Sequence, residues 1–420
     1  EMVMDAINAA EYATFQSPNA FANAIRAFKG AGGEGIRTAT EFVAPFTLTP
    51  TNIAARIMDF TPAGFIKAII QGLRPATRSQ KAIVESLGRA TTGTGIMAIG
   101  AYLGSKGMMT GNAPEDADER AMFFGEGKQA NSLIIGSQSF QLNRISPVGN
   151  LLALGAEFQR LSQEQEGLKL AGATALAGIK GLVEQTFLQG ISSALKVINE
   201  PERQYEKYVQ RAVAGLVPSI IGRTAKTIDP KLRIPDNVFE AVEERLPGLR
   251  KKVAPRRDIF GNIAPVPGGR LNLFDPFAIT KIKDDAVIRE AKKIGAVIGM
   301  PSRTISGVKL DQHEYSIYQK VQGKLLHEAL LGLINLPDYR ELSLVDKNKA
   351  FDSYIRSART QLNDILFPAL MIKRYDLPED TQPQILRSLL GELFQDEKFK
   401  GMSEEKQTKI IKRLLEEYAK

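Results

Sequence analysis

The chain has 420 residues, a formal net charge of +8 and an apolar fraction of 43%. It contains no Cys, which excludes disulfides, a thiol nucleophile and thiolate metal sites, and 2 His are too few for a His₃ zinc centre in one copy. The positive surplus comes mostly from residues 151–300 and is weaker than the bias typical of proteins that coat nucleic acid. Because the first residue is Glu1, we expect a processed product or a piece of a larger protein.

Helix signals dominate the sequence. Pairs such as Thr61-Pro62 and Ser146-Pro147 supply a hydroxyl that caps a free amide and a proline that suits the first helical turn. We therefore expect a mainly α protein, a multi-helix bundle. The expected helices lie near 2–29, 51–59, 63–73, 78–108, 147–164, 168–198, 202–226, 283–298, 311–335, 346–374, 379–395 and 403–419.

One small β-hairpin is expected near 132–142, where two apolar runs flank Gly136-Ser137. Residues 228–280 are rich in Pro and Gly and predict an extended segment, with one short helix near 236–245, that wraps a neighbour or links domains. These features divide the chain into an N-terminal helix with a Gly-rich linker, a small-residue-rich helical domain, the extended wrapping segment and a C-terminal helical domain. Their ranges are 1–35, 36–227, 228–280 and 281–420.

The longest uncharged run, Ala90 to Ser105, is too short to span a membrane in the ordinary way. As a helix it would rise about 24 Å, against a hydrocarbon core of roughly 30 Å. Small residues recur in it and in residues 168–198, which favours close helix packing in a water-soluble bundle or, alternatively, insertion into a membrane after a conformational change. The candidate positions for helix packing or membrane contact are Gly93, Gly100, Gly104, Gly107, Ala171, Ala175, Gly178 and Gly181.

Patterns that would indicate catalysis are weak, and we expect no catalytic residue, cofactor or metal. Glu85-Ser86 with the following Gly95-Ile96-Met97 has a faint similarity to lytic transglycosylases, but we interpret Glu85 as a helix-surface residue. The G-x-G-x-x-A match that begins at Gly93 lacks the preceding strand of a dinucleotide site. His313-Glu314 and His327-Glu328 lack the second His of a zinc-protease motif.

A basic run offers a candidate contact to nucleic acid. Such a run could neutralise phosphates without reading sequence, but we favour a solvated linker or a contact to an acidic neighbour. Its five cations are Arg250, Lys251, Lys252, Arg256 and Arg257.

A longer pattern begins at Val43-Ala44-Pro45-Phe46-Thr47-Leu48-Thr49-Pro50-Thr51-Asn52-Ile53. It continues through Met109-Thr110-Gly111, the hairpin and Arg144-Ile145-Ser146-Pro147, and it ends in the stretch 233–359. In this order the chain resembles the large polyvalent protein-associated domains of tailed bacteriophages. The resemblance implies a protein packaged in the virion, similar to internal or ejection proteins that leave the capsid with the DNA and build a conduit across the host envelope.

We therefore expect a non-enzymatic structural virion protein that forms homo-oligomers and contacts other virion proteins such as the portal or core. It would lie in the virion interior and, after ejection, in the host envelope, with host membrane and non-specific DNA as further partners and no small-molecule substrate. The alternative is a basic packaging protein of the virion interior that binds nucleic acid through 250–257. An enzyme that acts on peptidoglycan through Glu85 is a third hypothesis.

Overall fold

The computed structural model describes residues 57–73, 79–142, 145, 147–163, 210, 213–271 and 274–418. Over these residues the protein is mainly helical, with small antiparallel sheets that include a hairpin, so the predicted fold class is confirmed. The predicted helices near 2–29 and 168–198, most of that near 51–59 and the first part of that near 202–226 lie outside the described residues.

Two compact units make up the fold. Unit 1 takes the described residues of Glu1–Ala113, Gln129–Leu216 and Phe274–Lys281. Unit 2 takes those of Pro114–Lys128, Val217–Leu273 and Ile282–Lys420. The division therefore differs from the one expected from the sequence, because the boundary placed at 227/228 falls inside unit 2.

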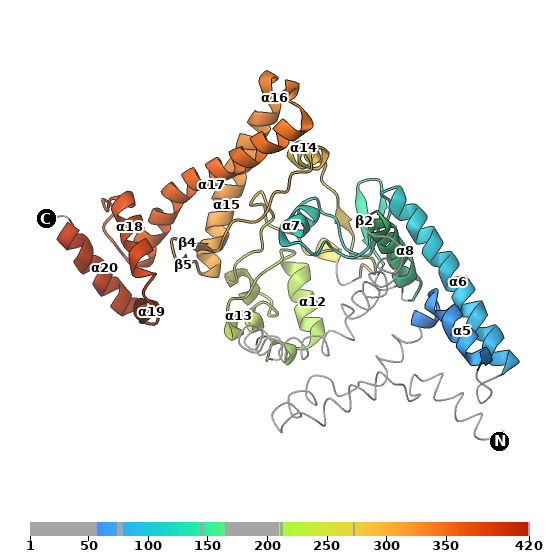
Figure 1. Ribbon diagram of the computed structural model, residues 1–420. Helices are drawn as coiled ribbons and strands as arrows, with labels where there is room; N and C mark the ends of the chain where they lie inside the picture. The colour runs from blue at the N-terminus through green and yellow to red at the C-terminus, as the bar shows by residue number, and fades with distance from the viewer. Residues whose placement is uncertain are drawn as a thin grey trace. The chain divides into compact units, whose positions relative to one another are not determined.

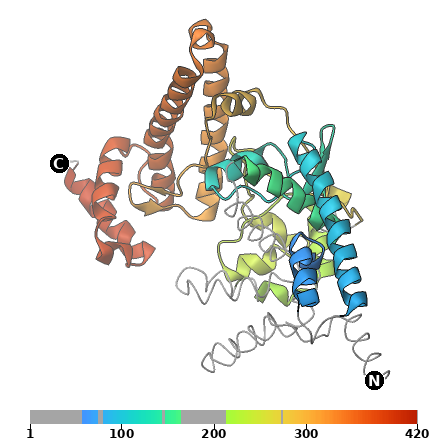
Figure 2. The same ribbon diagram turned by 45° about the vertical axis from the view of Figure 1, so that its right-hand side comes forward.

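Among the described residues of unit 1, three helices form its body and follow the expected ranges. They are α5 (Ala63–Leu73), α6 (Gln80–Ser105) and α8 (Val148–Ser162), which pack side by side (Figures 1 and 2). Local capping fixes two of the starts. The Thr61 hydroxyl accepts a hydrogen bond from the Ala63 amide at 3.3 Å, and the Ser79 hydroxyl accepts one from the Ala82 amide at 3.4 Å.

The expected hairpin is present in unit 1 and gains a third strand from far along the chain. The antiparallel order is β1 (Ser132–Ile135), β2 (Gln138–Gln141) and β3 (Thr280–Lys281). Gly136 makes the turn with a φ of 59°, a conformation that costs glycine little. Between the strands the buried Ser139 hydroxyl donates to that of Ser132 at 2.7 Å. The third strand gives the hairpin the neighbour that a two-stranded sheet needs in water.

Unit 2 contains the remaining elements, most of them helical. Short elements precede its long helices: α7 (Ala117–Gly125), α12 (Ser219–Ile228), α13 (Val238–Glu243), the 3₁₀ turns η2 (Leu249–Lys252) and η3 (Gly269–Leu271), and α14 (Ala286–Ile294). A hairpin of β4 (Thr304–Ile305) and β5 (Val308–Lys309) follows. The C-terminal helices are α15 (Gln312–Asn335), α16 (Pro337–Glu341), α17 (Leu344–Arg374), α18 (Pro383–Leu393), α19 (Glu397–Lys400) and α20 (Glu404–Tyr418).

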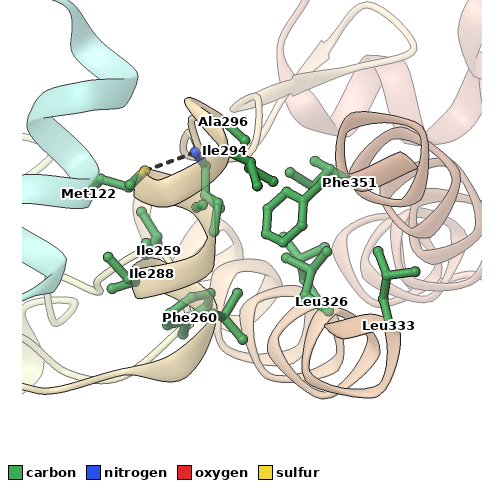
Figure 3. Close-up of a cluster of buried hydrophobic side chains, with 14 of the residues drawn as sticks. Met122, Ile259, Phe260, Ile288, Ile294, Ala296, Leu326, Leu333 and Phe351 are labelled. Carbon is green, nitrogen blue, oxygen red and sulfur yellow. Dashed lines mark hydrogen bonds between the residues drawn. The ribbon is translucent and has the colours of Figure 1, made fainter. Parts of the chain in front are cut away.

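Two apolar clusters hold unit 2 together. In the first, Phe351 of α17 lies close to Leu326 of α15, and Ile288 of α14 packs in the same cluster (Figure 3). The Met122 sulfur accepts a hydrogen bond from the Ile298 amide at 3.1 Å, which joins α7 to this cluster. The second cluster gathers α17, α18 and α20 around Phe367. Both clusters bury large side chains between amphipathic helices, as in an ordinary water-soluble bundle.

The Pro- and Gly-rich segment folds back on its own chain. Residues 230–234 pair with 254–256 on one side and with 264–266 on the other through isolated antiparallel bridges. The same segment crosses α15 so closely that a Cβ atom at Gly323 would lie 2.3 Å from the amide nitrogen of Gly261. Although its prolines lack an amide donor, the segment thus makes backbone hydrogen bonds to other parts of itself within unit 2. Wrapping of a neighbouring chain by 228–280 stays a prediction.

Candidate functional site

The helices of unit 1 meet at positions that have no side chain. A Cβ atom added at Gly100 of α6 would lie 2.0 Å from the carbonyl oxygen of Leu152 on α8. One added at Gly155 of α8 would lie 1.9 Å from the carbonyl oxygen of Met97 on α6. Real Cβ atoms essentially never approach closer than 3.0 Å, so α6 and α8 can pack this closely only with glycine at both positions.

Two other expected small-residue positions, both on α6, also lie at contacts. A third, just after α6, does not. At Gly93 a Cβ atom would lie 1.7 Å from the carbonyl oxygen of Phe60, and at Gly104 it would lie 3.0 Å from the Cα of Ala156. At Gly107 it would meet nothing within 4 Å. Gly107 has a φ of 68° and follows the end of α6, so its lack of a side chain serves the turn rather than helix packing. The remaining candidates, Ala171, Ala175, Gly178 and Gly181, lie outside the described residues.

The distribution of large and small apolar residues on α5 and α6 is partly the reverse of that in unit 2. On α5 the buried residues are Gly64 and Ala68, whereas Ile66, Ile69 and Leu73 are exposed. On α6 the buried positions are small except for Met97, and the exposed ones include Val84, Leu87, Ile99 and Tyr102. A water-soluble bundle usually buries its large aliphatic residues, while helices that pack in lipid meet through small ones. Unit 1 therefore presents apolar surface that another partner can cover.

Among the helices that the structure describes, none combines the length and the apolar character needed to span a bilayer.

In the basic run, the first cation is part of the interior of unit 2. The Arg250 side chain is 1% exposed, and its Nη1 donates to the carbonyl oxygen of Glu244 at 2.8 Å and to the carboxylate of the same residue at 2.9 Å. Its Nε donates to the carbonyl oxygen of Asp229 at 3.3 Å, and its Nη2 donates to that of Lys231. A buried guanidinium that holds four oxygen acceptors stabilises the fold and does not reach a phosphate in solvent.

The other four cations of the run do not converge on one surface. Arg257 donates to the Ser316 hydroxyl at 2.9 Å and to the carbonyl oxygen of Gly261 at 2.8 Å, which ties the segment to α15. Arg256 lies over the Phe124 ring at 5.8 Å, and partial burial lowers the pKa of its guanidinium. Lys251 and Lys252 are exposed. A contact to nucleic acid would therefore rest on the two lysines and Arg256.

The positions weighed for catalysis lie in surroundings that do not suit it. Glu85 is exposed on α6, and its carboxylate pairs with Arg89 at 3.2 Å, four residues along the same helix. The G-x-G-x-x-A match at Gly93 lies in the middle of α6, so it does not follow a strand. The described residues contain no group of three or more His, Asp or Glu side chains arranged to hold a metal ion.

Both histidines make local contacts in unit 2. The Nε2 atom of His327 lies 2.8 Å from a carboxylate oxygen of Asp285, whose other oxygen caps the first amides of α14. His313 is more exposed, and its Nε2 lies 3.9 Å from the carboxylate of Glu240. Each pair joins two helices of unit 2, which is a structural role.

An open cavity of about 1100 Å³ lies between α17 and α18 in unit 2. Its lining is apolar over most of its area but includes Gln384 and Glu392, and an ion pair joins Arg387 to Asp364 across it. The arginine is thus neutralised by a neighbour.

Three described acids are buried without having been singled out from the sequence, namely Glu126, Asp229 and Glu157, and the last is the most enclosed. Glu157 of α8 is buried, and its carboxylate accepts a hydrogen bond from the Asn112 amide at 3.0 Å and pairs with Arg160 at 2.7 Å. A Cβ atom at Gly111 would overlap this carboxylate, so the loop after α6 sits directly on it. No signal in the sequence marked it, because α8 also contains Asn150, Gln159 and Arg160, and a Glu three residues before an Arg is an ordinary surface pair.

No known protein family, curated protein or solved structure matches this chain.

Proposed function

We propose that the chain is a structural protein of a tailed-bacteriophage virion, part of a larger internal protein that is ejected with the DNA. In this proposal it works mechanically and not as an enzyme. It packs against copies of itself and other virion proteins, and it then helps to form an oligomeric conduit across the host envelope. The sequence resemblance described above supports the virion assignment.

The observation that carries the envelope step is the arrangement of unit 1. Its helices α6 and α8 touch through Gly100 and Gly155, and several large aliphatic side chains of α5 and α6 lie outward. Glycine contacts of this kind persist when a helix moves from one apolar neighbour to another, whereas the contact that α6 and α8 also make through Met97 and Leu151 buries apolar side chains from water. A protein needs contacts of the first kind if it is packed against protein in the capsid and against lipid later.

Dye-loaded vesicles test the envelope step directly. The purified chain, added at several pH values, is expected to release dye and to co-float with the vesicles. Absence of both release and flotation under every condition would refute this step. Placement of the chain inside intact particles, for instance as a ring at the portal in a reconstruction, tests the virion assignment separately.

The alternative function, a nucleic-acid-binding packaging protein, loses the first of its five cations because Arg250 is buried. Charge reversal at Lys251 and Lys252 tests what remains of it. If the wild-type chain binds DNA in a salt-dependent way and the reversed variant does not, the packaging role replaces the conduit as the better explanation.

A further inference from the structure

Three cations meet where α12 lies beside the end of α13 in unit 2 (Figure 1). Arg223 and Lys226 are three residues apart on α12, so their side chains are neighbours on the helix surface. A Cβ atom at Gly222 would lie 3.7 Å from the Cγ of Arg245, which places the aliphatic part of this arginine against α12 one turn before Lys226. Two segments of the chain thus bring three positive side chains together.

The carboxylate charge at this junction is smaller than the positive charge. Glu244 pairs with Lys226 at 4.0 Å, but the same carboxylate oxygen accepts a hydrogen bond from the buried Arg250 at 2.9 Å. The guanidinium groups of Arg223 and Arg245 form no ion pair or hydrogen bond with any residue that the structure describes. The positive charge of the cluster therefore stays largely uncompensated.

The ammonium group of Lys226 is affected by this excess. Partial burial lowers its pKa, and although the Glu244 carboxylate opposes the shift, the positive charges of three nearby arginines act in the same direction as burial. An anion that enters such a cluster offsets the repulsion between the cations and so stabilises all of them. The arrangement favours a negatively charged ligand.

The composition of the surrounding segment indicates which anion fits. Residues 217–273 contain 11 Lys and Arg against 6 Asp and Glu, a net charge of +5, whereas the whole chain has +8. Two of the three clustered cations are guanidinium groups, whose paired N–H donors match the oxygens of a phosphate. A segment with a broad positive charge attracts a ligand that carries many phosphates more strongly than a single small anion.

We propose that Arg223, Lys226 and Arg245 form a binding site for the phosphate groups of a nucleic-acid backbone, without selection of base sequence. The inference rests on the proposed function for the choice of nucleic acid, because a protein inside the virion lies against packaged DNA. It differs from the alternative function, since none of the three cations belongs to the basic run 250–257. Three cations hold few phosphates, which suits a protein that touches DNA locally and does not coat it.

The test compares three double variants of the full chain. Arg223→Gln with Arg245→Gln removes the two unpaired charges, and Arg223→Lys with Arg245→Lys keeps them. Arg289→Gln with Arg356→Gln is the matched control, because both arginines are exposed, on α14 and α17, and the change in net charge is the same. Circular dichroism and urea midpoints check folding. Binding is measured by fluorescence anisotropy with a short labelled DNA duplex at several salt concentrations, and by flotation with anionic vesicles.

The glutamine pair should weaken binding to the duplex roughly tenfold and lower the slope of log affinity against log salt by about 2, because two phosphate contacts are lost. The lysine pair should keep the wild-type slope, since the slope follows the number of charges, and the control should bind like the wild type.

Four outcomes would overturn the inference. They are a wild-type chain that binds no duplex, a glutamine pair that binds like the wild type, a lysine pair with the reduced slope of the glutamine pair, and a glutamine pair that loses vesicle binding but keeps DNA binding. The last would place the phosphates in lipid headgroups. None of them refutes the envelope step, which dye release from vesicles tests separately.

Discussion

The contact between α6 and α8 gives a sharp prediction, because two glycines on the same helix have opposite surroundings. Gly100 faces the Leu152 carbonyl, whereas Gly95 is exposed and a Cβ atom there would meet nothing within 4 Å. In a helix interior, alanine is favoured over glycine by about 1 kcal/mol. Gly95→Ala should therefore stabilise the protein by roughly 0.5–1 kcal/mol.

At Gly100 the same methyl group would lie 2.0 Å from the carbonyl oxygen, where ordinary contacts begin at 3.4 Å. The helices must separate locally by about 1.4 Å, and a gap of that size forfeits half or more of the dispersion energy of the atoms that faced each other. We expect Gly100→Ala to destabilise unit 1 by about 2–4 kcal/mol in spite of its better helix propensity.

Urea denaturation followed by circular dichroism, with amide exchange of α6 and α8 read by mass spectrometry, measures both variants. Exchange is needed because two units can unfold separately, and only the helices of unit 1 should lose protection. If Gly100→Ala proves as stable as Gly95→Ala, the close packing of α6 on α8 is not a property of the protein in solution.

Two further predictions concern unit 2. Arg250→Met should lower the free energy of unfolding by about 3–5 kcal/mol, because it leaves the Glu244 carboxylate and several carbonyl oxygens without their donor. Lys251→Met, the control, should change it by less than about 0.5 kcal/mol. The urea midpoints of the two variants should therefore differ clearly, and similar midpoints would contradict a buried role for Arg250. Burial raises the pKa of Tyr318 to about 12, and burial together with the nearby Glu290 carboxylate raises that of Tyr339 to about 12. Since an unfolded tyrosine ionises near pH 10, the contribution of these groups to stability is complete below pH 10 and is lost as the pH rises from about 10 to about 12. Tyrosinate absorbance and urea midpoints over this range check it, and titration of both tyrosines near pH 10 in the folded protein would refute it.

The helices and the hairpin were predictable because local signals carry them. Thr61-Pro62 fixed the start of α5, and the turn at Gly136-Ser137 fixed the register of β1 and β2. Helix α7 was not expected from the sequence, although Asp116 caps it by accepting hydrogen bonds from the amides of Asp118 and Glu119, both at 2.9 Å. That cap is a recognisable helix-start signal, but it stands inside a polar stretch that otherwise reads as a loop.

Features that depend on distant partners could not be read from the sequence. β3 pairs with β2 across more than a hundred residues of intervening chain, and two-residue strands carry almost no periodicity of their own. The basic run has five cations in sequence, but whether a cation is buried depends on what folds around it. Arg250 is taken into the interior by carbonyl groups at 229, 231 and 244, which no local pattern announces.

The reciprocal glycine contacts also set how α6 and α8 can move. Each helix has a notch that receives the backbone of the other, at Gly100 for Leu152 and at Gly155 for Met97. A slide by one turn in one direction would bring Met97 opposite Leu152, where even a Cβ atom at Gly100 has no room. A slide in the other direction would bring Gly104 there instead, so the glycine spacing of α6 blocks movement along α8 in one direction only.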